Sequence, residues 1–196
     1  MSNRATAPAK AKPKQELAPG DHVFLSILTW EPMSAYDVKK FMAASVSNFW
    51  SAAHSQVYQQ AKRLVRDGYV REREIPGGRR KRILQLTPKG RRAVTAWLRH
   101  PARPPQFYCE SLVKVFFARQ AGNLEATRRM LENERARFRE SLAMFEALLP
   151  FLQADEQERY PAMTLDMGIR LHRTMVEWLD DTIAKVDADL KASSSP

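Results

Sequence analysis

The chain has 196 residues, 44% of them hydrophobic, which is enough for one ordinary domain or two small domains with buried cores. Its net charge of +10 is uneven: residues 21–100 hold fifteen basic and six acidic side chains, whereas residues 101–196 hold thirteen and fifteen. A basic half of this kind favours a polyanionic partner such as nucleic acid. Since no stretch approaches the apolar run that a membrane-spanning helix needs, a transmembrane protein is excluded.

The N-terminus has the composition of a tail. Residues 1–20 are rich in Ala, Pro and Lys and show no apolar periodicity, which predicts a disordered basic segment. The segment also lacks the apolar core of a signal peptide, and the single cysteine, Cys109, cannot form an intrachain disulfide. Both features indicate a cytoplasmic protein. Cys109 itself is either a redox-sensing thiol or a small buried hydrophobe, and its apolar neighbours favour the second interpretation.

Two short helices are predicted next. Residues 23–30 are apolar nearly all round, and Asp21 is the predicted N-cap. Ser34 is the predicted N-cap of a second helix, residues 35–44. Two basic side chains of this second helix face outward, where a nucleic-acid backbone would pass: Lys39 and Lys40.

The remaining chain is arranged around a third helix, residues 54–67. Its apolar residues recur at helical spacing and predict one packed face, made by Val57, Ala61, Leu64 and Val65. The opposite face is polar and cationic. Gly68 ends the helix, and two strands follow, residues 69–75 and 81–86, joined by a Pro-Gly-Gly turn and a basic run at residues 79–82.

Three helices followed by a basic-tipped hairpin are typical of a winged helix-turn-helix, in which the third helix enters the major groove and the wing lies along phosphates. A solvated amphipathic helix followed by an ordinary hairpin is the alternative. The charge excess of residues 21–100 favours DNA binding.

The second half of the chain is predicted to be helical. A helix with Thr87 as N-cap and Pro88 at its first position runs to residue 98 or 99, and the Pro-rich residues 101–105 mark a domain boundary. A helix over residues 110–120 comes next. Residues 124–152 then carry a heptad seam that Pro150 kinks or ends, and a polar turn at residues 155–161 leads to a last helix, residues 163–191.

The two long helices predict an antiparallel hairpin whose seams serve dimerisation, with seams satisfied inside one monomer as the alternative. The predicted seam residues are Leu124, Leu131, Phe138 and Phe145 in the first helix and Leu165, Ile169, Val176, Leu179, Ile183 and Val186 in the second. The fold class is therefore mainly α. It comprises a winged helix-turn-helix domain with a two-stranded wing at residues 21–100 and a helical C-terminal dimerisation domain at residues 106–191.

An enzyme is not predicted. The four histidines are scattered without metal-ligand spacing, and no Gly-rich phosphate loop is present, so the sequence indicates no metal and no cofactor. A cluster of aromatic and Met side chains near the seam offers an apolar effector pocket, although the same spacing is more often that of a core: Phe116, Phe117, Met175 and Trp178.

An ordered series of motifs over residues 21–98 resembles the PadR family of bacterial transcriptional regulators, of the longer type with a helical C-terminal domain. The motifs are, in order, IL at residues 27–28, MSAYDVK at 33–39, FW at 49–50, HSQVY at 54–58, RLVRDGYV at 63–70 and LQLTPKG at 84–90. The C-terminal half resembles the family by helical layout alone. Gln59, where many members have Pro, and Ala53, where a helix-capping Ser is expected, depart from the pattern.

The resemblance implies a homodimer that binds an inverted-repeat operator in double-stranded DNA and usually represses a neighbouring gene. A small aromatic or hydrophobic effector would release the DNA. A protein-interaction and dimerisation module with a non-specific DNA-binding winged helix and no effector response is the alternative. The predicted base readers are Gln56 and Gln59 with help from Ser55; Tyr58, Lys62 and Arg63 contact phosphates near them, and Arg79, Arg80 and Lys81 hold backbone or minor groove.

Overall fold

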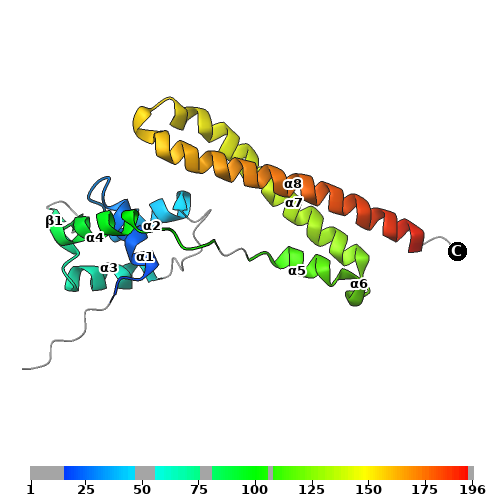
Figure 1. Cartoon of the computed structure of the whole chain (residues 1–196), viewed down its shortest axis with the longest axis horizontal. Helices are drawn as coiled ribbons and strands as arrows, with labels where there is room; N and C mark the ends of the chain where they lie inside the picture. The colour runs from blue at the N-terminus through cyan, green and yellow to red at the C-terminus, as the bar shows by residue number, and fades with distance from the viewer. Residues whose placement is uncertain (1–15, 47–55, 76–80, 106–107, 194–196) are drawn as a thin grey trace, which may run out of the picture. The chain divides into compact units, whose positions relative to one another are not determined.

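The computed structural model describes residues 16–46, 56–75, 81–105 and 108–193. The chain forms two compact units, which divide between Arg103 and Pro104, inside the Pro-rich segment (Figure 1). We call them the winged unit and the hairpin unit. Each has its own core and is considered separately.

The winged unit has the predicted order of elements, three helices, a hairpin and a fourth helix. The elements are α1 (Pro19–Ile27), α2 (Ala35–Ala44), α3 (Val57–Arg66), β1 (Val70–Ile75), β2 (Lys81–Leu86) and α4 (Pro88–Arg99). The two strands are antiparallel, with Val70 opposite Leu86 and Ile75 opposite Lys81. Met33, just before α2, adds a bridge to Leu84 through two backbone hydrogen bonds of 2.8 and 3.2 Å, which the sequence pattern did not indicate.

The predicted bounds and N-cap of the first helix are wrong. Because α1 begins at Pro19 and its N-cap is Ala18, Asp21 is the third helical residue. Its carboxylate accepts a hydrogen bond of 2.9 Å from the backbone N–H of Ala18, the carboxylate half of a capping box. The predicted cap of α2 is confirmed: Ser34 Oγ accepts from the N–H of Asp37 at 3.1 Å.

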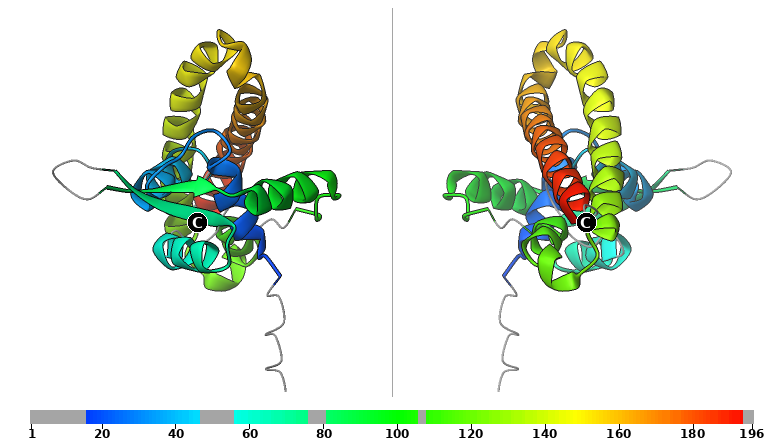
Figure 2. Two further views of the ribbon diagram at one scale, coloured as in Figure 1. Left: turned by 90° about the vertical axis from the view of Figure 1, so that its left-hand side faces the viewer. Right: turned by 90° about the vertical axis from the view of Figure 1, so that its right-hand side faces the viewer.

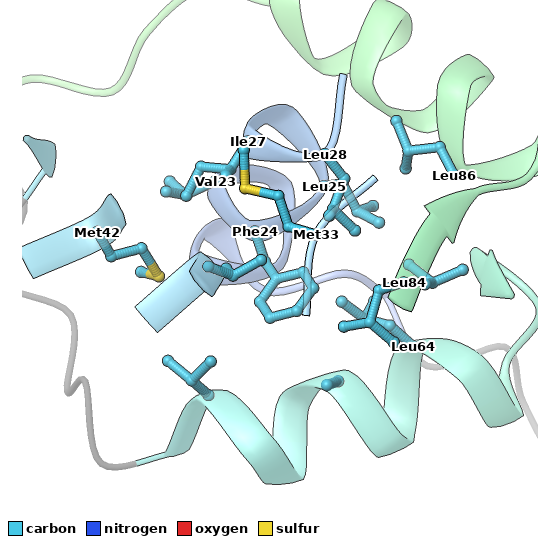
Figure 3. Close-up of a cluster of buried hydrophobic side chains, with 14 of the residues drawn as sticks. Val23, Phe24, Leu25, Ile27, Leu28, Met33, Met42, Leu64, Leu84 and Leu86 are labelled. Carbon is cyan, nitrogen blue, oxygen red and sulfur yellow. The ribbon is translucent and has the colours of Figure 1, made fainter. Parts of the chain in front are cut away.

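The core of the winged unit packs against the inner face of α3. Val57, Ala61 and Leu64 are buried, as their helical spacing predicted. Phe24 and Leu25 of α1 lie in the same cluster, which Leu84 and Leu86 of β2 complete (Figure 3). Burying one face of α3 in this way leaves the opposite face toward solvent.

Two glycines shape the connections around the wing. Gly68 has a φ of 75° and ends α3, with N–H bonds from Gly68 to Val65 O and from Tyr69 to Leu64 O that form a Schellman motif. Gly90 lies in the first turn of α4, where a Cβ would stand 2.2 Å from the backbone oxygen of Tyr69. The side chain of Thr87 caps α4 by accepting from the N–H of Gly90 at 3.1 Å. These contacts fix the wing against α3 and α4.

The described secondary structure of the hairpin unit is entirely helical. It consists of α5 (Glu110–Phe116), α6 (Ala118–Ala121), α7 (Leu124–Gln153), the 3-10 turn η3 (Glu156–Glu158) and α8 (Arg159–Ser193). The helix predicted over residues 110–120 is broken at Phe117. Helix α7 continues through Pro150 to Gln153, and α8 begins before Pro161. Pro161 is tolerated there because the first N–H groups of a helix have no intrahelical partner.

The apolar seams of α7 and α8 pack against each other within one chain, so their predicted use for dimerisation is corrected. The two helices run antiparallel and side by side (Figures 1 and 2). Six predicted seam residues are buried: Leu131, Phe145, Ile169, Leu179, Ile183 and Val186. Leu124 and Phe138 pack against this core, and Leu165 and Val176 are half-buried.

Polar groups also join the two long helices. The imidazole of His172 lies between the rings of Phe138 and Phe145, with centroid distances of 5.0 and 4.9 Å. Arg135 and Arg139 of α7 both donate to the carboxylate of Asp180 on α8 at 2.8 to 3.0 Å. Further ion pairs join Arg128 to Asp187 and Arg173 to Glu146. Apolar packing along the seam and ion pairs along the flanks therefore hold α7 and α8 together.

Candidate nucleic-acid interface and effector pocket

The outer face of α3 is the strongest candidate for DNA recognition. Tyr58, Gln59, Lys62 and Arg66 are exposed along it, and Gln56 is exposed at its N-cap. Among the described residues, the side chains of Gln59 and Lys62 have no hydrogen-bond or ion-pair partner. A helix with one buried apolar face and one free polar, cationic face has the form that a major-groove reading helix needs. Arg66, which the helical spacing places on the same face without a predicted contact, is also exposed there and pairs with Asp67 at 2.9 Å.

The remaining predicted DNA contacts fall on α2 and on the wing. Lys39 and Lys40 are exposed on α2, as expected. Ser55, Arg79 and Arg80 lie outside the described residues, and Lys81 begins β2 with its side chain outside the description. The start of α3 carries no side-chain cap, and Ala53 likewise lies outside the described residues.

The described body of the wing is less cationic than its sequence suggests. Arg82 of β2 pairs with Glu72 and Glu74 of β1, at 3.4 and 3.8 Å. Arg71 donates two hydrogen bonds to the side-chain oxygen of Gln85 on the facing strand. Gln85 holds the guanidinium of Arg71 along the sheet, while Glu72 and Glu74 also offset the charge of Arg82.

Arg63 is placed differently from its prediction. Its guanidinium makes a bidentate ion pair with Asp21, whose side chain has an exposed fraction of 0%, while that of Arg63 itself is 28%. Gln60, one turn earlier, donates to the same carboxylate at 2.8 Å. Since its donors already face a buried carboxylate, Arg63 no longer belongs to our set of phosphate contacts.

A second candidate site is an open cavity of about 290 Å³ at the surface of the hairpin unit, lined by residues of α5, α7 and α8. One part of its wall is apolar, made by Met130, Phe138, Leu171 and Met175. Another part is polar and is made by Cys109, Glu110, Ser111, Lys114, Glu134 and Arg137. Convergence of a few polar groups on an apolar hollow is typical of a small-molecule site, and this volume suits a compact ligand.

The polar wall is organised by short-range contacts. Ser111 is buried and donates to Glu134 Oε1 at 3.0 Å, and Cys109 Sγ lies 3.0 Å from Ser111 Oγ. The other carboxylate oxygen of Glu134 is buried without a hydrogen-bond partner among the described residues. Lys114 donates to Glu110 at 2.7 Å, and this hydrogen bond lowers the pKa of the Glu110 carboxyl.

The structure separates the four predicted effector residues. Met175 lines the cavity, whereas Trp178 packs against the hairpin core. Phe116 and Phe117 are 79% and 53% exposed, and their rings contact each other edge to face. Cys109 is half-buried, whereas its neighbours favoured a small buried hydrophobe. The polar wall residues escaped prediction because only the fold of α5 onto α7 brings Ser111 to Glu134.

The hairpin unit also exposes two apolar stripes. Met144, Leu148 and Phe151 form one on α7, and Tyr160, Met163, Met167 and Leu171 form the other on α8. Both stripes belong to the halves of the helices that adjoin their connection. A two-helix hairpin needs only one stripe per helix for its own seam, so these residues form additional apolar surface.

Two further kinds of site are absent from the described residues. No group of three or more His, Cys, Asp or Glu side chains there is placed to hold a metal ion. None of the helices there is both long and apolar enough to cross a membrane.

The two units match two protein families. Residues 24–96 match the Transcriptional regulator PadR-like family, and residues 109–187 match the family described as Virulence activator alpha C-term. The negative transcriptional regulator PadR of Bacillus subtilis is 24% identical over 177 residues, which cover 86% of this chain and 97% of that protein.

Solved structures share the whole fold. Bacillus subtilis PadR in complex with operator DNA has a TM-score of 0.75 at 22% identity, covering 87% of this chain and 99% of that chain. The same regulator in complex with p-coumaric acid has a TM-score of 0.66 at 21% identity, covering 90% and 98%. The likeness extends over both units, so the mainly α fold with a winged helix-turn-helix and C-terminal helices is confirmed.

Proposed function

Because this chain belongs to the PadR-like family of transcriptional regulators, we propose that it is a dimeric, sequence-specific DNA-binding repressor of a nearby operon. A small aromatic or hydrophobic effector releases it from DNA. The family is non-enzymatic, and the relative from Bacillus subtilis is named a negative regulator, which supports repression as the direction of control.

The outer face of α3 is the observation that carries the proposal. Tyr58, Gln59, Lys62 and Arg66 are exposed on it, while the inner face of the same helix is anchored in a closed core. Gln59 reads a base edge, because a Gln amide can bond in a bidentate way to adenine in the major groove. Lys62 and Tyr58 contact phosphates, and the exposed Lys39 and Lys40 of α2 add further phosphate contacts. Arg79, Arg80 and Lys81 extend the contact from the wing.

Titration of the protein into DNA from upstream of its own gene, beside a scrambled duplex and at several salt concentrations, tests this function. We expect tighter binding to the native duplex with two protomers per site. The alternative, a non-specific DNA-binding interaction module, predicts equal affinities for both duplexes and a steep dependence of both affinities on salt concentration. It also predicts that duplexes selected from a random library bind no more tightly than the scrambled duplex.

Two single substitutions separate the roles on α3. Gln59→Ala is expected to change the preference at one base pair by about 1–3 kcal/mol and to leave other positions unaltered. Lys62→Ala is expected to weaken all duplexes alike and to lower the salt slope by about one. Uniform weakening by Gln59→Ala would remove it from the base readers.

The apolar stripes on α7 and α8 support a dimer. Seven large hydrophobic side chains stand exposed there although the seam between the two helices is already filled. A second copy of the hairpin would cover them and make a helix bundle, which is the stable arrangement for helices that carry two apolar stripes. The α7 and α8 seam residues then act indirectly, by holding the stripes in place.

The cavity between α5, α7 and α8 is our proposed effector site. Met130, Phe138, Leu171 and Met175 would receive the apolar body of the ligand, and the polar wall around Ser111 would orient it. Since a homologous structure contains p-coumaric acid, that compound is the first probe. Phe116, Phe117 and Trp178 lie outside the lining and are not part of this proposal.

Filling the cavity tests the effector site. Met175→Trp is expected to abolish release of DNA by p-coumaric acid while the free protein still binds DNA, measured by fluorescence anisotropy of a labelled duplex. Thr174→Trp adds the same side chain at the exposed neighbouring position and is the matched control. Retained release in Met175→Trp would place the effector elsewhere.

A further inference from the structure

The winged unit contains a buried carboxylate that joins its first helix to the reading helix. Asp21 lies in the first turn of α1, and its side chain has no exposed surface. Its two oxygens accept four hydrogen bonds, from the N–H of Ala18, from Nε2 of Gln60 and from both terminal nitrogens of Arg63. We call Asp21, Gln60 and Arg63 the α1–α3 clamp.

A buried carboxylate is stable only when such donors surround it, and a bidentate guanidinium is the most directional of them. The clamp therefore constrains more than the distance between α1 and α3. Gln60 and Arg63 are one turn apart on the same flank of α3, so contact with a single point on α1 restricts rotation of α3 about its own axis. Figure 3 shows the apolar core that lies between the two helices, with Phe24 of α1 and Leu64 of α3 on it.

The flank that carries the clamp adjoins the outer face of α3. Gln59 precedes Gln60, and Lys62 precedes Arg63, so each clamp residue follows a proposed DNA contact. Successive residues of a helix are about 100° apart around its axis, so each clamp residue lies beside a proposed DNA contact. Because Gln59 and Lys62 project from the same helix, a small rotation of α3 about its axis would move both of them. The side chain of Arg63 is 28% exposed, which means that a guanidinium released from Asp21 has a path to solvent.

We propose that Asp21 is a positioning residue for sequence reading, an inference that rests on the proposed role of α3 in DNA binding. It sets the rotation of α3, so that Gln59 faces base edges. It also withholds the charge of Arg63 from phosphates. Both effects raise the preference for an operator over other DNA, the first by supporting specific contacts and the second by limiting non-specific attraction.

Asp21→Asn tests the proposal, because it keeps the shape of the side chain and removes its charge. The probes are a duplex enriched from a random library by the wild-type protein and a scrambled duplex of the same length, each titrated at several salt concentrations. We expect the ratio of the two affinities to fall by about tenfold. Non-specific affinity should rise and its salt slope should increase by about 0.9, the value of one added phosphate contact.

Two controls separate positioning from general effects. Asp166→Asn makes the same change of net charge in the exposed Asp166–Arg170 pair of the hairpin unit and should leave the affinity ratio unchanged. Val94→Ala weakens the core of the winged unit without touching the clamp, and at temperatures where it is folded it should also leave the ratio unchanged.

Arg63→Gln provides a second test of the proposal if the Asp21→Asn variant does not fold. It is expected to lower the affinity ratio without raising non-specific affinity, since the released guanidinium is absent. Combined with Asp21→Asn, it should cancel the gain in salt slope. An unchanged ratio in both variants, or an equal loss on both duplexes, would overturn the proposal. A wild-type protein without sequence preference would overturn both this inference and the proposed function.

Discussion

Among the described residues, the winged unit buries fifteen hydrophobic side chains in one cluster, whereas the largest cluster of the hairpin unit buries four. Exposure shows the reverse, because twelve of the seventeen exposed large hydrophobic side chains belong to the hairpin unit. The winged unit surrounds its core with four helices and a hairpin, while two long helices can cover only one stripe of each other. The first unit is complete by itself, and the second has apolar surface left for a partner.

Core truncation should reveal this difference most strongly. Leu64 of α3 and Leu179 of α8 are both fully buried, and replacing either with Ala is expected to cost about 2–5 kcal/mol of unfolding free energy. The loss at Leu64 should not depend on protein concentration. The loss at Leu179 should diminish at higher concentration, because the proposed dimer would stabilise the hairpin. Amide hydrogen exchange of the full chain at two concentrations measures both, and identical concentration dependence would contradict the comparison.

Charges on the apolar stripes should act on association alone. Phe151→Glu and Met167→Glu are each expected to raise the dimer dissociation constant by at least about tenfold, since burying an unpaired carboxylate costs more than 1.4 kcal/mol. Sedimentation over a range of concentrations measures this. Leu98→Glu, on an exposed residue of the winged unit, is the matched control and should not alter association. A wild-type protein that stays monomeric would refute the dimer itself.

Replacing glycine with alanine should destabilise the winged unit at one position and stabilise the hairpin unit at another. Gly90→Ala places a Cβ 2.2 Å from the backbone oxygen of Tyr69 and should cost about 1–3 kcal/mol, because backbone on both sides must move. Gly168→Ala, within α8, meets only the ring of Phe145 at 3.7 Å and should stabilise the hairpin by about 0.5–1 kcal/mol. Thermal unfolding of the two variants shows whether the signs differ.

Lowering the pH should destabilise the hairpin unit slightly, through protonation of Asp180. A side-chain hydrogen bond from Arg135, with help from Arg139, lowers the pKa of Asp180 in the folded state. Its stabilisation is therefore complete above the unfolded value of about 4 and is lost as the pH falls through the folded value. Because these three side chains are partly exposed to solvent, the effect should stay below about 1 kcal/mol. Asp180→Asn should remove this part of the pH dependence, and so should the Arg135→Gln, Arg139→Gln double variant.

Much of the winged unit was predictable from local chemistry. Ser34, Thr87 and Gly68 mark helix ends by capping and by left-handed backbone, and these signals need only a few neighbouring residues. The spacing of Val57, Ala61 and Leu64 determined which face of α3 is buried. The polar face that we propose as the DNA reader followed from the same periodicity.

The hairpin unit illustrates the limit of such signals. A heptad seam predicts that a helix needs an apolar partner, but it does not distinguish a partner in the same chain from one in a second chain. Leu131 and Leu179 meet inside one chain because α8 turns back along α7. The stripes at Met144, Leu148 and Phe151 then become the surface without an internal partner.

The sequence by itself determined the order of the elements in the winged unit, the caps at Ser34 and Thr87, the buried face of α3 and the location of the positive charge. Each of these depends on residues close together in the chain. Only the tertiary structure decided that Arg63 pairs with Asp21, that Ser111 and Glu134 share a cavity wall, and that the seams are intramolecular. Those contacts join residues far apart in sequence, and their energies exist only once the intervening chain has folded and brought the groups into hydrogen-bonding or van der Waals distance.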